Sequence, residues 1–248
     1  MLHILFRDQH FIAIHKPAGL LVHRSEVDRH ETRFAIQLLR DQIGQHVWPV
    51  HRLDRGTSGV LLFALDKDAL TAASRQFESG LVTKEYMAVV RGWPASAGLI
   101  DYPLRRIREE DGHDSDAPAQ EARTHFQRLA TLTLEVCVDR YPTSRYALLR
   151  LQPETGRRHQ LRRHLKHIAH PIIGDATYGK GAHNRLFQQT FSTGRLLLAC
   201  TALHLHHPLE GTQMNLVCPP ADDFKQVLAH PNWVAENGGV TDSRIFHG

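Results

Sequence analysis

Cysteine is scarce in this chain and follows no pattern. Only three cysteines occur in 248 residues, and no two of them share the CxxC spacing of a zinc or redox motif. An odd number of widely spaced thiols excludes a disulfide-stapled secreted scaffold and a zinc–thiolate centre, and it is typical of a reducing compartment. The three are Cys137, Cys200 and Cys218.

Long hydrophobic runs are also missing. No apolar stretch approaches the roughly 20 residues that a membrane-spanning helix needs, and the opening MLHILFRDQH becomes charged too early for a signal peptide. Apolar residues make up 42% of the chain and charged residues 23%, which is ordinary for a protein that buries a hydrophobic core. We therefore expect a globular protein of the cytoplasm with no membrane association.

Several common catalytic motifs are absent as well. The patterns GxGxxG, GxxxxGK[ST], GxSxG and HExxH do not occur, which disfavours nucleotide-binding, serine hydrolase and zinc protease chemistries. The chain holds 19 histidines, but only the pairs His164/His167 and His167/His170 of the basic segment have helical i, i+3 spacing, with no acid or cysteine close by. We expect no metal and no cofactor.

Apolar periodicity predicts an α+β fold with a mainly antiparallel sheet. Short apolar runs often follow one another without an intervening helix, which is typical of antiparallel strands. Helices are predicted over 32–43, from Asp66 to near Gly80, after Gly156 and around Phe224. Strands are predicted over 2–6, 11–14, 60–65, 84–90, 124–129, 133–138, 146–151, 196–205 and 214–217. Residues 105–123 are predicted to form a variable surface loop, and 237–248 a loose tail.

Positive charge is concentrated in residues 155–174, TGRRHQLRRHLKHIAHPIIG. This block carries five Arg and Lys side chains and no acid, whereas the whole chain has a net charge of only +4. Such a block attracts polyanions, and a solvated helix face is the alternative. Within it, Leu161 and Leu165 form a buried stripe. Phosphate contacts are predicted for four of the cations, Arg157, Arg158, Arg163 and Lys166.

The segment HRLDRGTSG, residues 51–59, is the most informative stretch. Asp54 stands between Arg52 and Arg55 and is followed by Gly, Thr, Ser and Gly. Nearby cations keep a carboxylate ionised, as a nucleophile or a base requires. The structural alternative is an aspartate–arginine pair that pins a turn.

HRLDRGTSG resembles the catalytic signature of the RluA-type pseudouridine synthases. Further blocks of that family occur in the same order: HKPAGL at 15–20, KEY at 84–86, TGRRHQLR at 155–162 and PIIGD at 171–175. Together the resemblance spans roughly residues 2–220. Other segments resemble the TruC branch of this family in particular, namely LVHRS at 21–25, RDQIGQH at 40–46, RYPTSRY at 140–146 and RRH at 162–164.

The resemblance implies roles for individual residues. It makes Asp54 the catalytic carboxylate and Arg162 the arginine that pairs with it. Tyr86 is similar to the family tyrosine that stacks on the target base, and Arg52 to an arginine that displaces the target nucleotide. Arg55 is predicted to contact a phosphate. The path by which Asp54 acts stays open (attack on C1′, addition to the base, or removal of a 2′ proton), and so do core packing for Tyr86 and a phosphate contact for Arg162.

The resemblance also implies a function and a fold. It implies isomerisation of uridine to pseudouridine in tRNA, at uridine 65 of the T stem, with base flipping and without a cofactor. The implied fold has an active-site cleft across a central sheet flanked by helices and loops. We expect one catalytic domain over 1–236, without the N-terminal S4-like domain of many rRNA-modifying relatives. The expected partner is tRNA, and no obligate protein partner is implied, so that the chain acts as a monomer.

Two alternatives to this function stay open. The first keeps the chemistry and changes the substrate to rRNA. The second is a non-catalytic RNA-binding or RNA-folding module built on the same fold.

Overall fold

The computed structural model describes residues 1–23, 32–107 and 116–236. The chain divides into two compact units, each assembled from three separate segments. Unit 1 comprises Met1–Glu85, Pro103–Gln120 and Cys200–Cys218, and unit 2 comprises Tyr86–Tyr102, Glu121–Ala199 and Pro219–Gly248. Among the described residues, no helix is both long enough and apolar enough to cross a bilayer.

Unit 1 is built on strands that pair mainly antiparallel. They are β1 (His3–Arg7), β2 (Phe11–Lys16), β3 (Trp48–Pro49), β4 (Ser58–Ala64), β9 (Leu198–His206, in unit 1 from Cys200) and β10 (Gln213–Val217). Their order is β1-β2-β4-β9-β10, and β3 makes a short pairing with β4. Every residue of β4 is buried. Such a continuous apolar run marks a strand that is covered on both faces.

Two helices of unit 1 lie close to their predicted bounds. α1 (Ala35–Ile43) begins three residues after position 32 and ends at Gly44, whose φ of 68° closes the helix in the left-handed conformation. Gln42 of α1 exchanges two hydrogen bonds with the main chain of Leu2, so the helix is fixed beside β1. α2 (Lys67–Glu78) follows Asp66, whose Oδ1 accepts a hydrogen bond from the Ala69 N–H at 2.7 Å.

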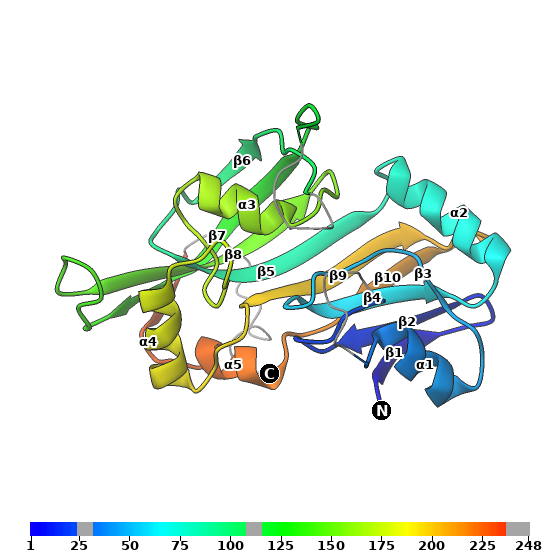
Figure 1. The fold of residues 1–248 in the computed structure, drawn as a ribbon, viewed down its shortest axis with the longest axis horizontal. Helices are drawn as coiled ribbons and strands as arrows, with labels where there is room; N and C mark the ends of the chain where they lie inside the picture. The colour runs from blue at the N-terminus through cyan, green and yellow to red at the C-terminus, as the bar shows by residue number, and fades with distance from the viewer. Residues whose placement is uncertain (24–31, 108–115, 237–248) are drawn as a thin grey trace. The chain divides into compact units, whose positions relative to one another are not determined.

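The described part of unit 2 is a second group of antiparallel strands with three helices. The strands are β5 (Thr83–Arg91, in unit 2 from Tyr86), β6 (Ala97–Asp101), β7 (Arg123–Leu134), β8 (Ser144–Pro153) and β11 (Trp233–Ala235). The helices are α3 (Gln160–His167), α4 (Gly181–Phe191) and α5 (Asp222–Leu228). The strand order is β5-β8-β7-β11, and β6 also pairs with β7. Figure 1 shows the long hairpin that β7 and β8 form.

Both faces of β8 are buried. Tyr146 and Leu148 join a cluster that includes Phe187 of α4 and Phe224 of α5. The alternate residues Ala147, Leu149 and Leu151 join a second cluster with Leu161 and Leu165 of α3. Successive side chains of a strand point to opposite faces, so β8 packs α3 on one side and α4 with α5 on the other. The predicted α+β fold with mainly antiparallel strands is confirmed.

One prediction of secondary structure is wrong. Residues 124–129 and 133–138 do not form two strands, because β7 is a single strand that ends at Leu134. The pairing with β8 shifts register between Arg128 and Ala130, and this bulge changes which residues face inward. The break in the apolar pattern at Leu129 therefore marks a bulge inside one strand rather than a turn between two.

Other elements were not predicted, or lie beyond what the structure describes. The short strands β3, β6 and β11 and the helix α4 have no counterpart among the predicted elements. The loop predicted over 105–123 is described only at 105–107 and 116–123, where Leu104 forms a bridge with Gln120. The tail predicted over 237–248 lies outside the described residues.

Candidate active site

Asp54 lies in unit 1 on the connection between β3 and β4, which a half-buried histidine supports. His51 stacks on Phe77 with ring centroids 5.1 Å apart, and its Nε2 accepts a hydrogen bond from the Leu62 N–H at 3.1 Å. Burial, with repulsion from Lys84, lowers the pKa of His51 from 6.5 to about 4. A neutral imidazole is what this bond needs, because a protonated ring nitrogen cannot accept.

A tight turn then presents Asp54 itself. The Thr57 N–H donates to the Asp54 carbonyl at 3.1 Å, which closes a turn over residues 54–57. The residues on either side of Asp54 differ in exposure, since Leu53 is buried while Arg52 and Arg55 are exposed. The Asp54 carboxylate lies between these extremes and is partly exposed.

The HKPAGL segment supports this turn from the other side. The Nζ of Lys16 donates to three main-chain carbonyls, those of Pro17 at 2.9 Å, Leu20 at 2.7 Å and Arg55 at 3.2 Å. Gly19 N–H also donates to the Arg55 carbonyl at 2.8 Å, and Arg55 Nε returns a bond to the Gly19 carbonyl at 3.2 Å. Lys16 is fully buried, so its ammonium ties the two loops together instead of binding a ligand.

A glycine at the start of β4 completes the support of this turn. Gly59 has a φ of 110°, and a Cβ there would lie 2.0 Å from the carbonyl oxygen of Cys200 on β9. Any side chain at this position would therefore separate β4 from β9 within unit 1. The second glycine of HRLDRGTSG is thus required by close backbone packing.

Tyr86 begins the part of β5 that belongs to unit 2. It pairs with Leu151 of β8, and its ring packs partly buried against the cluster that contains Leu149 and Leu161. Core packing, the alternative noted for Tyr86, therefore accounts for part of its ring, and the prediction that it stacks on a base stays a prediction.

Arg162 lies on α3 and forms an ion pair with Asp175. Its Nε donates to Asp175 Oδ2 at 2.7 Å and its Nη2 to Asp175 Oδ1 at 2.9 Å. The Arg162 side chain is 11% exposed and that of Asp175 is 0% exposed, so the pair is shielded from water. Arg162 belongs to unit 2 and Asp54 to unit 1, and their predicted pairing stays a prediction.

Gln160 fixes the start of α3. Its Oε1 accepts from the Arg157 N–H at 3.0 Å and from the Thr155 hydroxyl at 2.7 Å. Its Nε2 donates to the Arg123 carbonyl at 2.9 Å and to the Thr124 hydroxyl at 3.0 Å. This amide, which is buried, uses both of its ends to anchor the turn of the TGRRHQLR block to β7.

The four cations predicted to contact phosphate differ in exposure. Lys166 and Arg157 are exposed, and Arg157 Nε also donates to the Glu121 carbonyl at 3.0 Å. Arg163 is half-buried on the outer side of α3. Arg158 is half-buried too, and its buried Nη1 makes no hydrogen bond with the described residues. Contact of these cations with RNA stays a prediction.

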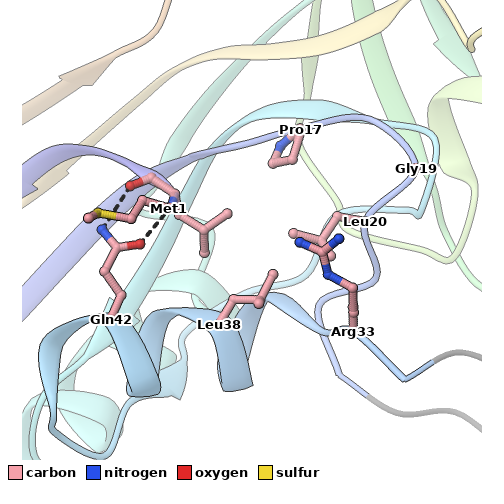
Figure 2. A pocket seen from close by; sticks show the side chains of 8 residues that line it. Met1, Pro17, Gly19, Leu20, Arg33, Leu38 and Gln42 are labelled. Atoms are coloured by element: carbon pink, nitrogen blue, oxygen red, sulfur yellow. Dashed lines mark hydrogen bonds between the residues drawn. The ribbon is translucent and has the colours of Figure 1, made fainter.

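A pocket of about 560 Å³ lies in unit 1 beside the HKPAGL segment. Figure 2 shows Leu38 and Gln42 of α1 on one side and Pro17 and Leu20 on the other, with the Arg33 guanidinium near its rim. Asp54 does not line it. Among residues 1–23, 32–107 and 116–236, no group of three His, Cys, Asp or Glu side chains is placed to hold a metal ion.

Sequence reasoning missed the partner of Arg162. The block PIIGD contains Asp175, but an acid 13 positions after Arg162 carries no periodicity that would join the two. The one signal that could have found it is chemical: a helix with three Arg and Lys side chains and no acid needs a carboxylate elsewhere if one of these cations is buried. Lys16 was likewise part of a quoted block without a predicted role.

Comparisons with known proteins identify the family of the chain. The family description "RNA pseudouridylate synthase" matches residues 10–167. The tRNA pseudouridine synthase C of Pasteurella multocida is 50% identical over 89% of this chain and 92% of its own, and that of Vibrio cholerae is 48% identical over 88% and 89%. The solved structure of human RNA Pseudouridylate Synthase Domain Containing 4 is 28% identical, with a TM-score of 0.69, and covers 95% of both chains. This chain belongs to the RNA pseudouridylate synthase family.

Proposed function

We propose that this chain isomerises uridine to pseudouridine in tRNA, at uridine 65 of the T stem. The observation that carries the proposal is a partly exposed carboxylate, Asp54, on a turn that Lys16 and His51 hold from two sides. The relatives named tRNA pseudouridine synthase C, about half identical over most of the chain, support tRNA as the substrate. The position rests on the resemblance to the TruC branch.

The reaction needs no redox change and no donor of a group. The N1–C1′ bond of uridine breaks, the base turns, and a C5–C1′ bond forms. The C5 hydrogen leaves as a proton and N1 gains one, so product and substrate are isomers. Three side chains carry this chemistry: the Asp54 carboxylate acts on the nucleoside, the Tyr86 ring stacks on the flipped base, and the Arg162 guanidinium pairs with the carboxylate.

Charge supports catalysis over simple RNA binding. A carboxylate among phosphate-binding cations weakens RNA affinity by repulsion, so an RNA-binding module gains nothing from Asp54. Arg52, which is exposed beside Asp54, takes the space of the displaced nucleotide in this proposal. Phosphates are contacted by Arg55 and by the cations in and before α3, namely Arg157, Arg158, Arg163 and Lys166.

We propose that the chain works as a monomer in the cytoplasm. The tRNA substrate supports this compartment, and the three cysteines without a paired spacing are consistent with it. Sedimentation of the purified protein with and without tRNA would test the monomer, and a dimer in the absence of tRNA would contradict it.

Release of tritium from a tRNA transcript labelled at uridine C5 tests the function directly. Isomerisation replaces the C5 hydrogen, so each released tritium counts one turnover. We expect release by the wild type and none by Asp54→Asn. The affinity for tRNA should be nearly unchanged or slightly higher, because the substitution keeps the volume of the side chain and removes a charge that repels phosphates. A matching collapse of affinity in Asp54→Asn would assign Asp54 a structural role.

The same assay separates the alternatives. Release from rRNA fragments but not from tRNA would keep the enzyme and overturn the substrate. Binding of tRNA without release from any RNA would favour the non-catalytic module. In that case charge reversal at Arg158 and Arg163 would abolish the phenotype, while Asp54→Asn would not.

A further inference from the structure

Asp175 is a buried carboxylate that accepts hydrogen bonds from Arg162 and from two main-chain N–H groups. Besides the two bonds from Arg162, its Oδ1 accepts from the Thr177 N–H and the Tyr178 N–H, both at 2.9 Å. Burial acts to raise the pKa of Asp175, but the Arg162 guanidinium and these two N–H groups outweigh burial and hold the pKa below its ordinary value. The carboxylate therefore stays charged opposite Arg162.

The backbone around Asp175 is fixed as firmly as its side chain. Its carbonyl accepts from the Gly179 N–H and from Asn184 Nδ2, both at 3.1 Å. Asn184 Oδ1 in turn accepts from the Gly174 N–H at 2.8 Å. A Cβ on Gly174 would lie 1.8 Å from the Arg195 carbonyl oxygen, so the main chain packs too closely there for any side chain. The Asp175 carboxylate therefore lies on a loop, residues 174–179, whose main chain is held by these hydrogen bonds.

Tyr178 holds the face of the same guanidinium. The Arg162 Cζ lies 5.0 Å from the centroid of the Tyr178 ring, within the range of a cation–π contact. The Tyr178 hydroxyl makes a hydrogen bond with His159 Nδ1 at 3.1 Å, which fixes the ring. The Arg162 guanidinium is thus held at Nε and Nη2 by Asp175 and over its plane by the Tyr178 ring. Nη1 is the nitrogen that the Asp175 bonds do not use.

We propose that Asp175 is a positioning residue that sets the rotamer and orientation of Arg162 for the isomerisation assigned above. This inference rests on the proposed function, in which Arg162 acts on the catalytic carboxylate. A planar guanidinium bound at two points cannot turn, so its Nη1 side keeps one direction. Such a fixed donor saves the reorganisation that a mobile arginine would need at each turnover.

A purely structural role for Asp175 makes a different prediction. In that role the carboxylate would only fasten the loop at 174–179 to α3, and its removal would lower activity whatever residue stands at 162. A positioning role acts through Arg162 alone. The two roles therefore differ in whether the effect of Asp175 depends on Arg162.

The test is a double-mutant cycle of Asp175→Asn and Arg162→Ala, measured by tritium release and by tRNA affinity. We expect Asp175→Asn to lower kcat about 10- to 100-fold, with tRNA Kd nearly unchanged. In the Arg162→Ala background we expect no further decrease. An equal decrease in both backgrounds, or no decrease in either, would overturn the proposal.

Asp139→Asn is the matched control. Asp139 also pairs with an arginine of unit 2, since Arg91 Nη2 donates to its Oδ2 at 2.7 Å, but its side chain is 47% exposed. We expect kcat of Asp139→Asn to match the wild type. If Asp175→Asn does not fold, Arg162→Lys replaces the two-point grip by a single point in an otherwise intact site. Full kcat in Arg162→Lys would overturn the proposal.

A second readout does not depend on turnover. The Arg162 Nε–H signal, identified by its disappearance in Arg162→Ala, can be followed by 15N NMR hydrogen exchange. We expect slow exchange in the wild type and in Asp139→Asn, and exchange at least about tenfold faster in Asp175→Asn, because a buried charge-assisted bond is removed. Unchanged exchange in Asp175→Asn would overturn the grip on Arg162. If the wild type releases no tritium while the exchange pattern is as expected, the proposed function fails and the grip remains.

Discussion

Lys16 and His51 support the same turn, Lys16 as a charged ammonium and His51 as a neutral imidazole. The Lys16 ammonium has three N–H groups, and each finds a main-chain carbonyl, so the buried charge is compensated. His51 instead has to accept a hydrogen bond from the Leu62 N–H, which only the neutral ring can do. Each protonation state follows from the backbone groups that the side chain meets.

Replacement of Lys16 by methionine should destabilise unit 1. Methionine keeps most of the aliphatic volume but removes the buried ammonium. The Arg55 carbonyl keeps the Gly19 N–H as a donor, while the bonds to the Pro17 and Leu20 carbonyls are lost, and we expect the free energy of unfolding to fall by about 2–4 kcal/mol. Urea denaturation measures this change. The exposed Lys67, changed to methionine in the same way, should shift stability by less than about 0.5 kcal/mol. Equal stability of the two variants would mean that the Lys16 bonds contribute nothing.

His51 should make stability fall in mild acid. The folded protein keeps His51 neutral down to a pKa of about 4, whereas the unfolded chain takes up the proton below its ordinary value of 6.5. Between pH 6.5 and 4 the unfolded state therefore binds more protons, and this residue lowers the free energy of unfolding by up to about 1.4 kcal/mol per pH unit. His51→Gln keeps an acceptor for Leu62 without titrating. Urea unfolding at pH 7, 6 and 5 should show a flatter slope for the variant, and parallel slopes would refute this role.

At the scale of elements, the sides of α3 face different surroundings: the core, Asp175 and solvent. Leu161 and Leu165 pack into the core, and Arg162 turns to Asp175. Lys166 is exposed, with its Nζ 5.6 Å from the Tyr178 ring. Because the charge of Arg162 is balanced by Asp175, the long-range attraction of RNA falls to the cations on the outer side of the helix.

Charge reversal on that outer side should weaken tRNA binding and flatten its salt dependence. For Arg163→Glu with Lys166→Glu, we expect the log–log slope of affinity against salt to fall by about one unit for each phosphate that the variant no longer neutralises. Titrations of tRNA at several salt concentrations measure the slope. Lys225→Glu on α5, where Lys225 lies 3.9 Å from Asp222, is the control and should leave the slope as it is. An unchanged slope in the double variant would remove α3 from the RNA surface.

The sequence predicts elements well where burial follows a single period. α2 could be placed because its cap and its apolar spacing agree, and β4 because its run of apolar residues is unbroken. β7 could not, because a bulge at Leu129 changes the inward face within one strand. Asp54 could be proposed from its local pattern, and its catalytic role stays a prediction. Asp175 instead depends on a contact with a residue 13 positions away, which no local pattern encodes.

At the scale of the whole molecule, neither unit is a continuous piece of sequence. The chain passes from one unit to the other at Glu85, Tyr102, Gln120, Ala199 and Cys218. Two of these passages occur inside strands, in β5 and in β9, where no flexible linker is available. Units joined by continuous strands transmit the unfolding of one to the other through the backbone itself.

We therefore expect the two units to unfold in one transition. The chain has three tryptophans, with Trp48 in unit 1 and Trp93 and Trp233 in unit 2. One variant, Trp93→Phe with Trp233→Phe, reports on unit 1 by fluorescence, and Trp48→Phe reports on unit 2. Urea midpoints measured with the two variants, each compared with circular dichroism of the same protein, should coincide. Two separate midpoints within one variant would show independent units.

The late position of β9 in the chain sets the timing of folding during synthesis. β4, apolar at every position from Val60 onward and buried throughout, is complete at Ala64, but its neighbour β9 begins only at Leu198. On a ribosome that adds roughly 5–20 residues per second, the edge of β4 that β9 will take waits for about 7 to 27 seconds. An apolar strand edge left open for that time is a site for pairing with another nascent chain. The yield of folded protein in a cell should therefore depend on what shields β4 during this interval, as much as on the stability of the finished molecule.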